Sequence, residues 1–521
     1  MIKDIRRLRE RGSTPKVKDW LFVVVALIIF VCLAFYMITK SSVWFDEAFG
    51  AYLTRYNFID IARYTAMDIH PPLYYWLLKI WSMLFGNTEF ALRSMSVLFG
   101  GVTIIFGYLL QNRLFDKKVA RISLIFMVLS PMLVRYSQEM RMYTLVSAIA
   151  LAATYLLTVA IESHKKLYWV IYGVLVSLGL WVHYLSVIVW IAHWLWRADN
   201  IRRIAKNKND FMTKFFSKEW NLAFFIALGL YVPWLPFCIG QLLISQIAGS
   251  WIPAANLGTP LNFFTNVVYY RDLGETTGLL AFGLLAASAV LVFLSIKVYK
   301  SFDSAQRQAY RLIMALALVP VLLLFFESIL LRPTFIDRYL ITSTEGLALF
   351  IGVTLAFSCK RFKLIWCYFS IIFIAILMMI GIANVYRLGN YNKNTHATNQ
   401  TRQIVQAATA QAKDGQPIIV ATPWIFYEAI FYSTDSHPVY FVGPFRDKAS
   451  SLDMLKYSNF RKITDVPKFT GQHPIIWYVG WDGNGKLKAP YSNWEELQEV
   501  KVNDLISGKP EYKAIQYKIN S

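Results

Sequence analysis

The sequence of 521 residues has little charge and few cysteines. Charged residues make up 16% of the chain and hydrophobic residues 56%, and the mean hydropathy is +0.42. Soluble domains carry about 25% charged residues, so this composition excludes an ordinary soluble protein. Without metal-ligand spacing or a secreted small-domain context, the cysteines are interpreted as small apolar side chains and not as a disulfide framework. They are Cys32, Cys238, Cys359 and Cys367.

Signatures of nucleotide-binding proteins are also missing. The sequence contains no Gly-x-Gly-x-x-Gly motif and no Gly-x-x-x-x-Gly-Lys motif, and we detect no internal repeat. Acidic residues are scarce, with 32 Asp and Glu against 53 Lys and Arg, which gives a formal net charge of +21. Such a basic excess is typical of nucleic-acid binding. In a membrane protein, however, Lys and Arg gather in the cytoplasmic loops.

Long hydrophobic runs are what the chain does contain. Seven basic residues precede the first run, 20–39, which is long enough to cross a bilayer and is expected to be a retained helix with its N-terminus inside. Ten further spans bring the prediction to about eleven transmembrane helices in a mainly α, polytopic membrane protein. They are expected at 92–111, 120–135, 142–161, 167–182, 184–196, 220–243, 277–296, 311–331, 340–358 and 364–384.

The stretch 167–196 decides the orientation of everything after it. It is long enough to be one tilted helix, or two short helices with a break at His183-Tyr184. With the break, the basic segment 197–218 lies on the cytoplasmic side, together with most Lys and Arg between spans. The positive-inside rule therefore favours two helices. The charge excess is explained by orientation, and we expect contacts with membrane lipids and no nucleic-acid partner.

The pattern changes near residue 385. Short apolar strands are predicted at 417–422, 438–443, 475–480 and 512–518, and helices at 398–413, 424–432, 450–457 and 493–499. Alternating elements of this kind predict a small α/β domain. We therefore expect a transmembrane domain at 1–384 and an extracytoplasmic α/β domain at 385–521.

An acidic pair, Asp46-Glu47, follows the first span in an aromatic setting. Ionisable groups at a membrane boundary are costly to desolvate, which makes this pair a functional candidate. The predicted topology places it outside. The rest of this first outer loop is expected to lie along the membrane surface as juxtamembrane helices at 49–67 and 73–85, separated by the helix-breaking His70-Pro71-Pro72.

Further polar residues are predicted on the same outer face. Arginines that face outward against the positive-inside trend suggest an anionic partner, and the guanidinium fork suits phosphate oxygens. Each residue alone has a simpler explanation: Arg135 or Arg338 as an end anchor, His183 as the filling of a helix break, or an ion pair of Glu139 with Arg141. The set comprises Asp68, His70, Lys79, Arg135, Glu139, Arg141, Tyr143, His183, Tyr184, Glu327, Asp337, Arg338 and Tyr339.

This combination of groups suits a transfer reaction. A carboxylate can accept the proton of an attacking hydroxyl, guanidinium groups can hold a departing phosphate, and an aromatic groove at the membrane can receive a lipid chain. The parts fit the transfer of a group from a lipid phosphate to a hydroxyl or amine outside the membrane.

Three segments resemble a known family. Trp44-Phe45-Asp46-Glu47-Ala48, then His70-Pro71-Pro72-Leu73-Tyr74-Tyr75-Trp76-Leu77, then Arg93, resemble the first-loop signature of GT-C-type membrane glycosyltransferases. The most similar group comprises the protein O-mannosyltransferases and the bacterial aminoarabinose transferases. Segments 136–143 and 337–340 resemble further motifs of this group, and the similarity covers roughly residues 20–360.

The resemblance implies a polyprenyl-phosphate-linked sugar as donor and transfer at the outer face of the cell membrane. Asp46 matches the acidic catalytic position, and His70 stands where many members have lysine. In the resulting hypothesis Asp46 is the base towards a glycan, lipid or protein acceptor. Arg141, Arg338 and His70 hold the departing phosphate, and the anomeric centre is inverted.

Two points stay open at the level of sequence. Glu47 either supports Asp46 or joins it in holding a divalent metal cation, the one cofactor considered. A secondary transporter or flippase of a lipid-linked or anionic solute also has about a dozen helices, although its ionisable residues usually lie near the membrane midplane.

Overall fold

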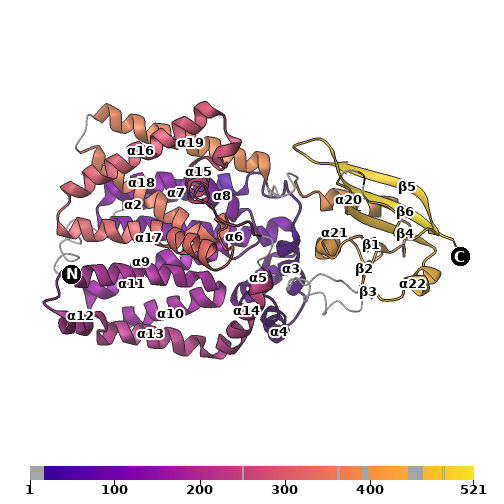
Figure 1. Ribbon diagram of the computed structural model, residues 1–521, viewed down its shortest axis with the longest axis horizontal. Coiled ribbons are helices and arrows are strands. Elements are labelled where there is room, and N and C mark those ends of the chain that lie inside the picture. The colour runs from indigo at the N-terminus through magenta and orange to yellow at the C-terminus, as the bar shows by residue number, and fades with distance from the viewer. Residues whose placement is uncertain are drawn as a thin grey trace. The chain divides into compact units, whose positions relative to one another are not determined.

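The computed structural model describes residues 17–248, 252–360, 364–389, 398–443, 461–483, 485 and 487–520 (Figure 1). The chain forms two compact units, each described here by itself. The first comprises Met1–Tyr36, His70–Tyr74 and Arg93–Arg387, and the second Met37–Ile69, Tyr75–Leu92 and Leu388–Ser521. The first-loop segments that carry Asp46 and Lys79 thus group with the C-terminal residues.

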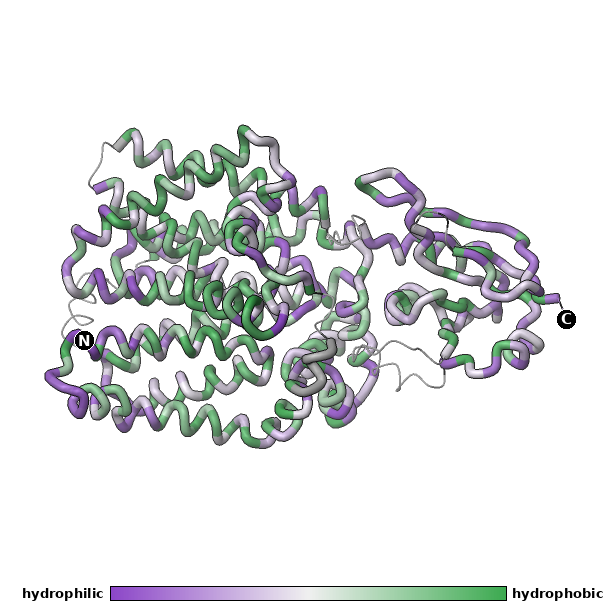
Figure 2. Tube along the Cα trace, in the orientation of Figure 1, coloured by the Kyte–Doolittle hydropathy of each residue, from purple (hydrophilic) through white to green (hydrophobic). Residues whose placement is uncertain are grey.

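The first unit is helical. Eight helices are long and apolar enough to cross a membrane, and the bent pair α7 (Lys117–Val128) and α8 (Pro131–Ser137) would make a ninth in the described part of the chain. Figure 2 shows these helices as mostly hydrophobic along their length. The eight correspond to α2 (Val17–Phe35), α6 (Glu89–Leu114), α9 (Tyr143–Ser163), α13 (Lys218–Tyr231) with α14 (Leu235–Ala248), α16 (Gly278–Ser301), α17 (Ser304–Leu330), α18 (Ile341–Ser358) and α19 (Leu364–Leu388). A multi-pass membrane protein is confirmed, and the number eleven stays a prediction.

The predicted span at 120–135 is broken. Helices α7 and α8 meet at an angle of 57°. Ser130 accepts a hydrogen bond from the Leu133 N–H at 3.3 Å, and Pro131 occupies the first turn of α8. Proline lacks an N–H and its ring clashes with a continuing helix, so the chain restarts a helix here.

A break also separates the two helices predicted within 167–196. Helix α10 (Lys166–Val182) ends where His183 adopts an extended conformation, and the 3-10 turn η1 (Tyr184–Ser186) leads into α11 (Val187–Arg202). The His183 Nδ1 accepts a hydrogen bond from the Leu185 N–H at 3.1 Å and caps this turn. The predicted break is therefore present.

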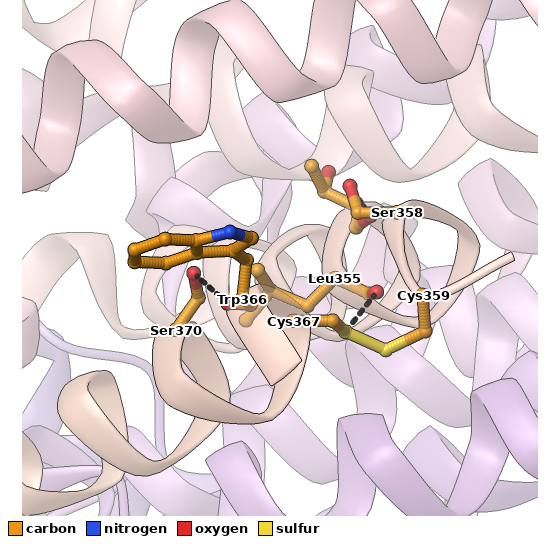
Figure 3. Close-up of a disulfide and its surroundings, with 7 residues drawn as sticks. Leu355, Ser358, Cys359, Trp366, Cys367 and Ser370 are labelled. Carbon is orange, nitrogen blue, oxygen red and sulfur yellow. Dashed lines mark hydrogen bonds between the residues drawn. A yellow bond between two sulfur atoms is a disulfide. The ribbon is translucent and has the colours of Figure 1, made fainter. Parts of the chain in front are cut away.

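Two of the cysteines depart from the sequence-based expectation. Cys359 at the end of α18 and Cys367 near the start of α19 form a disulfide, with their Cα atoms 5.2 Å apart (Figure 3). Two helices joined by a short link bring residues eight positions apart within bonding reach. Treating all four cysteines as apolar fillers was wrong for this pair, whereas Cys32 and Cys238 are free thiols.

The second unit contains the first-loop helices and a sheet. The first-loop helices are α3 (Phe45–Leu53), α4 (Phe58–Ala66) and α5 (Leu73–Phe85), of which α5 begins in the first unit. The six strands lie in the order β3-β2-β1-β4-β6-β5, parallel from β3 to β4 and antiparallel at β6 and β5. The strands are β1 (Ile418–Val420), β2 (Val439–Val442), β3 (Lys462–Ile463), β4 (Ile475–Trp481), β5 (Trp494–Asn503) and β6 (Pro510–Ile519).

The predicted α/β character of the C-terminal residues is confirmed, although one predicted helix is a strand. Helices α20 (Thr401–Gln411) and α21 (Phe426–Tyr432) match predictions, and α22 (Val466–Gln472) is additional. The helix predicted at 493–499 is wrong, because these residues belong to β5, which pairs with β6 from Trp494↔Ile519 onward. Tertiary strand pairing overrides the helix preference of its Glu, Leu and Gln residues. The helix predicted at 450–457 lies outside the described residues.

Close packing of α17 and α18 gives a test of the first unit. A Cβ at Gly346 would lie 2.7 Å from the backbone nitrogen of Ala317, whereas a Cβ at Gly283 meets nothing within 4 Å. Gly346→Ala should therefore cost about 1–3 kcal/mol of stability through overpacking. A lower thermal midpoint in detergent is expected for Gly346→Ala and an unchanged one for Gly283→Ala. Equal midpoints would show that the two helices do not pack this closely.

Candidate active site

The acidic pair lies in the first turn of α3. Asp46 is the second residue of this helix and Glu47 the third. Glu47 is buried, with 1% of its surface exposed, and its carboxylate accepts a hydrogen bond from the Trp44 N–H at 3.3 Å. Asp46 is partly exposed. The structure thus separates two neighbours that the sequence could not: Glu47 holds its own helix, and Asp46 is the carboxylate that solvent can reach.

A second buried carboxyl group lies beside this turn. Glu428 on α21 is 4% exposed and accepts a hydrogen bond from the Asn399 Nδ2 at 2.9 Å. It also forms a short hydrogen bond with the Thr401 hydroxyl. Burial, with a contribution from the charge of Glu47, raises the pKa of Glu428 to about 7 despite these hydrogen bonds. The sequence pattern predicts the helix here but does not single out Glu428.

Aromatic side chains pack α3 against α21. Phe45 and Tyr427 have ring centroids 5.8 Å apart, and Phe49 and Tyr52 approach the same Tyr427 ring to 5.5 and 4.9 Å. Phe45 also meets Trp424 at 5.1 Å. Such edge-on and tilted aromatic pairs each contribute about 0.5–1.5 kcal/mol beyond area burial. The helix with the acidic pair is therefore part of the core of the second unit.

Lys79 is occupied within the second unit. It donates to the backbone carbonyl of Thr54 at 2.9 Å, just beyond the last residue of α3, and its Nζ lies 5.9 Å from the centroid of the Phe58 ring. A cation is favourable at a helix C-terminus. The contacts of Lys79 therefore support a role in holding α3, alongside the predicted role in substrate binding.

The first unit gathers cations and imidazoles. Arg141 is 2% exposed, and its Nη2 lies 3.5 Å from the His70 Nε2. The rings of His70 and His183 have centroids 5.7 Å apart, and His183 approaches Tyr339 to 5.5 Å and Tyr143 to 6.4 Å. Segments near residues 70, 141, 183 and 339 thus converge, as the sequence analysis predicted for its outer-face set.

His183 is held as a neutral hydrogen-bond donor. Burial lowers its pKa well below the usual value, and the nearby His70, Arg141 and Arg338 lower it further. Because Nδ1 accepts the Leu185 N–H, the proton of the neutral ring lies on Nε2. This Nε2 is buried and has no hydrogen-bond partner in the described part of the protein. It is available to donate to a ligand oxygen.

Arg338 completes the cationic group. It lies in the 3-10 turn η4 (Asp337–Leu340), with its Cζ 5.8 Å from the centroid of the Tyr339 ring. Arg338 and Arg141 both interact electrostatically with Tyr143. Asp337 in the same turn accepts a hydrogen bond from the Asn266 Nδ2 at 2.9 Å. The turn therefore carries one anchoring acidic residue and one arginine next to the histidine cluster.

The remaining predicted residues have structural contacts of their own. Glu139 pairs with Arg135 at 2.9 Å. The Ser96 hydroxyl of α6 donates to the Glu139 carbonyl at 2.6 Å, which fixes the turn before Arg141. Arg93, one helical turn before Ser96 on α6, is 2% exposed. These contacts indicate that Glu139 and Arg135 shape the site rather than line it.

A metal centre finds no further support. Among the described residues, no group of three or more His, Cys, Asp or Glu side chains is arranged to hold a metal ion. Glu47 is already committed to the Trp44 N–H. A divalent cation at Asp46 and Glu47 therefore stays a hypothesis.

Comparison with known proteins gives a match of part of the chain to a family and a likeness in fold. Residues 69–237 match the family model of dolichyl-phosphate-mannose-protein mannosyltransferases. The fold is that of ArnT from Cupriavidus metallidurans in the apo state, with a TM-score of 0.61 and 13% identity over 95% of this chain and 97% of that one. The chain therefore has the fold of ArnT, and part of it is similar to the mannosyltransferase family.

Other solved structures share this fold. ArnT from the same organism bound to undecaprenyl phosphate matches with a TM-score of 0.59 and 13% identity over 96% of this chain and 98% of that one. The Archaeoglobus fulgidus oligosaccharyltransferase in the apo form matches with a TM-score of 0.52 and 12% identity over 89% and 69%. No curated protein matches in sequence.

The raised pKa of Glu428 predicts how the stability of this protein depends on pH. The pKa of this carboxyl group is about 7 in the folded protein, against 4.5 for an ordinary glutamate, so the folded state binds the proton more tightly than the unfolded chain does. The stability that results from this proton is fully present below about pH 4.5 and is lost as the pH rises through 7, a change of roughly 3 kcal/mol. Glu428 also faces Glu47 and Tyr512.

Glu428→Gln removes this titration. We expect the thermal midpoint of the purified protein to fall between pH 5 and 8 in the wild type and to fall less in the variant. Parallel midpoint curves for the two proteins would contradict the protonation assigned to Glu428.

Proposed function

We propose that this glycosyltransferase moves a sugar from a polyprenyl-phosphate donor to a hydroxyl or amine of a glycan, lipid or protein. Transfer takes place on the outer face of the membrane, with the N-terminus inside. ArnT, whose fold this chain shares, has a structure bound to undecaprenyl phosphate. The match of residues 69–237 to a dolichyl-phosphate-mannose family supports the same class of donor.

The observation that carries the proposal is the partly exposed Asp46 on a fixed helix turn. Its neighbour Glu47 is buried and bonded to the Trp44 N–H, so Asp46 is the carboxylate assigned to the acceptor. It takes the proton of the acceptor group while that group attacks the anomeric carbon. General-base catalysis of this kind contributes about 10²–10⁴-fold.

The cationic group of the first unit supports binding of the donor phosphate. Arg141 offers a planar fork suited to phosphate oxygens, and Arg338 adds a second positive charge. The neutral His183 donates from Nε2. His70 lies next to Arg141, whose Nη2 is 3.5 Å from the His70 Nε2. As the bond between sugar and phosphate breaks, negative charge grows on the phosphate, and these groups stabilise it.

This assignment needs no second carboxylic acid. A glycosidase protonates its leaving group, whereas a phosphate leaves as a stable anion. A single displacement by the acceptor inverts the configuration at the anomeric carbon. Glu47 then acts by holding the helix turn, and a divalent cation at the pair is the alternative that chelation tests.

Substitution of the pair tests the base. Asp46→Asn should lower kcat for transfer from a labelled polyprenyl-phosphate sugar at least 10²-fold, with donor KM nearly unchanged, because the amide cannot accept the proton. Asp60→Asn on the neighbouring α4 is the matched control. Full activity of Asp46→Asn would refute the assignment, and loss of activity with EDTA, restored by Mg²⁺ or Mn²⁺, would favour the metal alternative.

Arg141 is tested by a change that keeps its charge. Arg141→Lys removes the planar fork but retains a cation, so we expect donor binding to weaken about 10-fold or more. Arg63→Lys, at an exposed ion pair with Asp60, should bind the donor as the wild type does. Equal donor affinity of Arg141→Lys and wild type would remove Arg141 from the phosphate site.

A further inference from the structure

We propose that Glu428 is a positioning residue for the transfer reaction: through Asn399, this carboxyl group of the C-terminal domain fixes the backbone that leads into α3 and thereby the side chain of Asp46. The inference rests on the proposed function of Asp46 as the base. It also gives the C-terminal domain a role in catalysis besides any choice of acceptor.

The start of α3 depends on one of its own carboxyl groups and on the C-terminal domain. The first N–H groups of a helix have no partner within it. The residue before α3 is Trp44, whose side chain offers no acceptor to these groups. Glu47 accepts the Trp44 N–H, and the preceding Val43 is held through Asn399, which donates to both Val43 and Glu428. The backbone just before Asp46 is therefore held directly by Glu47 and, through Asn399, by Glu428.

Glu428 is itself fixed by the segment before α20. The Asn399 amide donates to Glu428 at 2.9 Å and to the Val43 carbonyl at 3.3 Å. Thr401 bonds both Glu428 and the Asn399 Oδ1, the latter at 2.8 Å. One small network therefore joins the Val43 carbonyl, in the backbone that leads into α3, to the Glu428 carboxyl group.

The network also indicates where a proton lies. The Thr401 hydroxyl has one hydrogen but two acceptors, the Asn399 Oδ1 and the Glu428 carboxyl. If Glu428 carries a proton, it donates to Thr401 while Thr401 donates to Asn399, and every bond is satisfied. A neutral Glu428 also avoids repulsion with Glu47, the other buried carboxyl group at this turn.

Further hydrogen bonds join the residues just before α3 to the C-terminal domain. The Val43 N–H donates to the Tyr432 hydroxyl at 2.6 Å, and the Ser42 hydroxyl donates to the Gln403 side chain at 3.0 Å. With the aromatic packing of α3 on Tyr427, these contacts make the position of Asp46 depend on residues nearly 400 positions later in the chain. A shift of about 1 Å at a catalytic group can cost on the order of 10²-fold in rate.

Kinetics of full-length variants test the inference. Glu428→Ala leaves the Asn399 amide without the carboxyl oxygen that holds it beside the Val43 carbonyl, so kcat should fall about 10- to 100-fold with donor KM changed less than about threefold. Glu428→Gln should retain at least about a third of wild-type kcat, because its amide oxygen accepts the Asn399 N–H and its amide nitrogen donates to Thr401.

Asp504→Ala is the matched control. Asp504 is also a buried carboxylate of this domain, and it accepts the Thr398 N–H and hydroxyl at 2.6 Å each. We expect it to lower the thermal midpoint but not kcat. Wild-type kcat in Glu428→Ala, equal loss in the Gln and Ala variants, or equal loss in Asp504→Ala would each overturn the inference.

Hydrogen exchange separates this inference from the proposed function. Amide exchange of residues 45–53 should accelerate in Glu428→Ala and stay at the wild-type rate in Asp504→Ala, whether or not the protein is turning over a donor. Unchanged exchange of α3 in Glu428→Ala refutes the positioning role. Accelerated exchange in a protein that transfers no sugar refutes the proposed function alone.

Discussion

The first turn of α3 is the constraint on which the account depends. A helix that starts in a polar, partly buried place must find acceptors for its free N–H groups, and an unsatisfied one costs about 1–3 kcal/mol. Here the buried Glu47 accepts the Trp44 N–H, and the buried Glu428 binds Asn399, which donates to the Val43 carbonyl just before the helix. The arrangement places carboxyl groups close together, and protonation of Glu428 relieves the repulsion. Asp46 is the partly exposed carboxylate of this turn, and it is the one assigned to the acceptor.

The two units carry different kinds of charged group. The second unit holds the carboxyl groups on a helix packed into its own core, and the first unit holds the arginines and histidines on turns between membrane helices. In the first unit, burial and neighbouring cations keep His183 neutral, so it contributes a donor without adding to a positive charge that is already dense. This arrangement suits a ligand whose negative charge increases during the reaction.

The sequence predicted the parts that local pattern controls. Apolar spans, the break at His183, and the buried strands β1 and β4 follow from hydrophobic runs, proline placement and loop charge. The features that it missed depend on contacts over long separations. Residues 494–503 form a strand because β6 is there to pair with them, and Glu428 binds Asn399, which holds the Val43 carbonyl more than 350 residues earlier. The pairing of Cys359 with Cys367 depends on how two apolar helices meet.

The central claim is that Asp46 lies on the outer side of the membrane, and thiol labelling tests it most directly. In a variant lacking the native cysteines, single cysteines replace the exposed Arg55 and Lys413 of the second unit and the exposed Lys206 between α11 and α12 (Lys208–Phe215). A membrane-impermeant thiol reagent added to intact cells should label positions 55 and 413, and label position 206 only after permeabilisation. Labelling of position 206 from outside, with positions 55 and 413 protected, would place Asp46 in the cytoplasm and contradict the account.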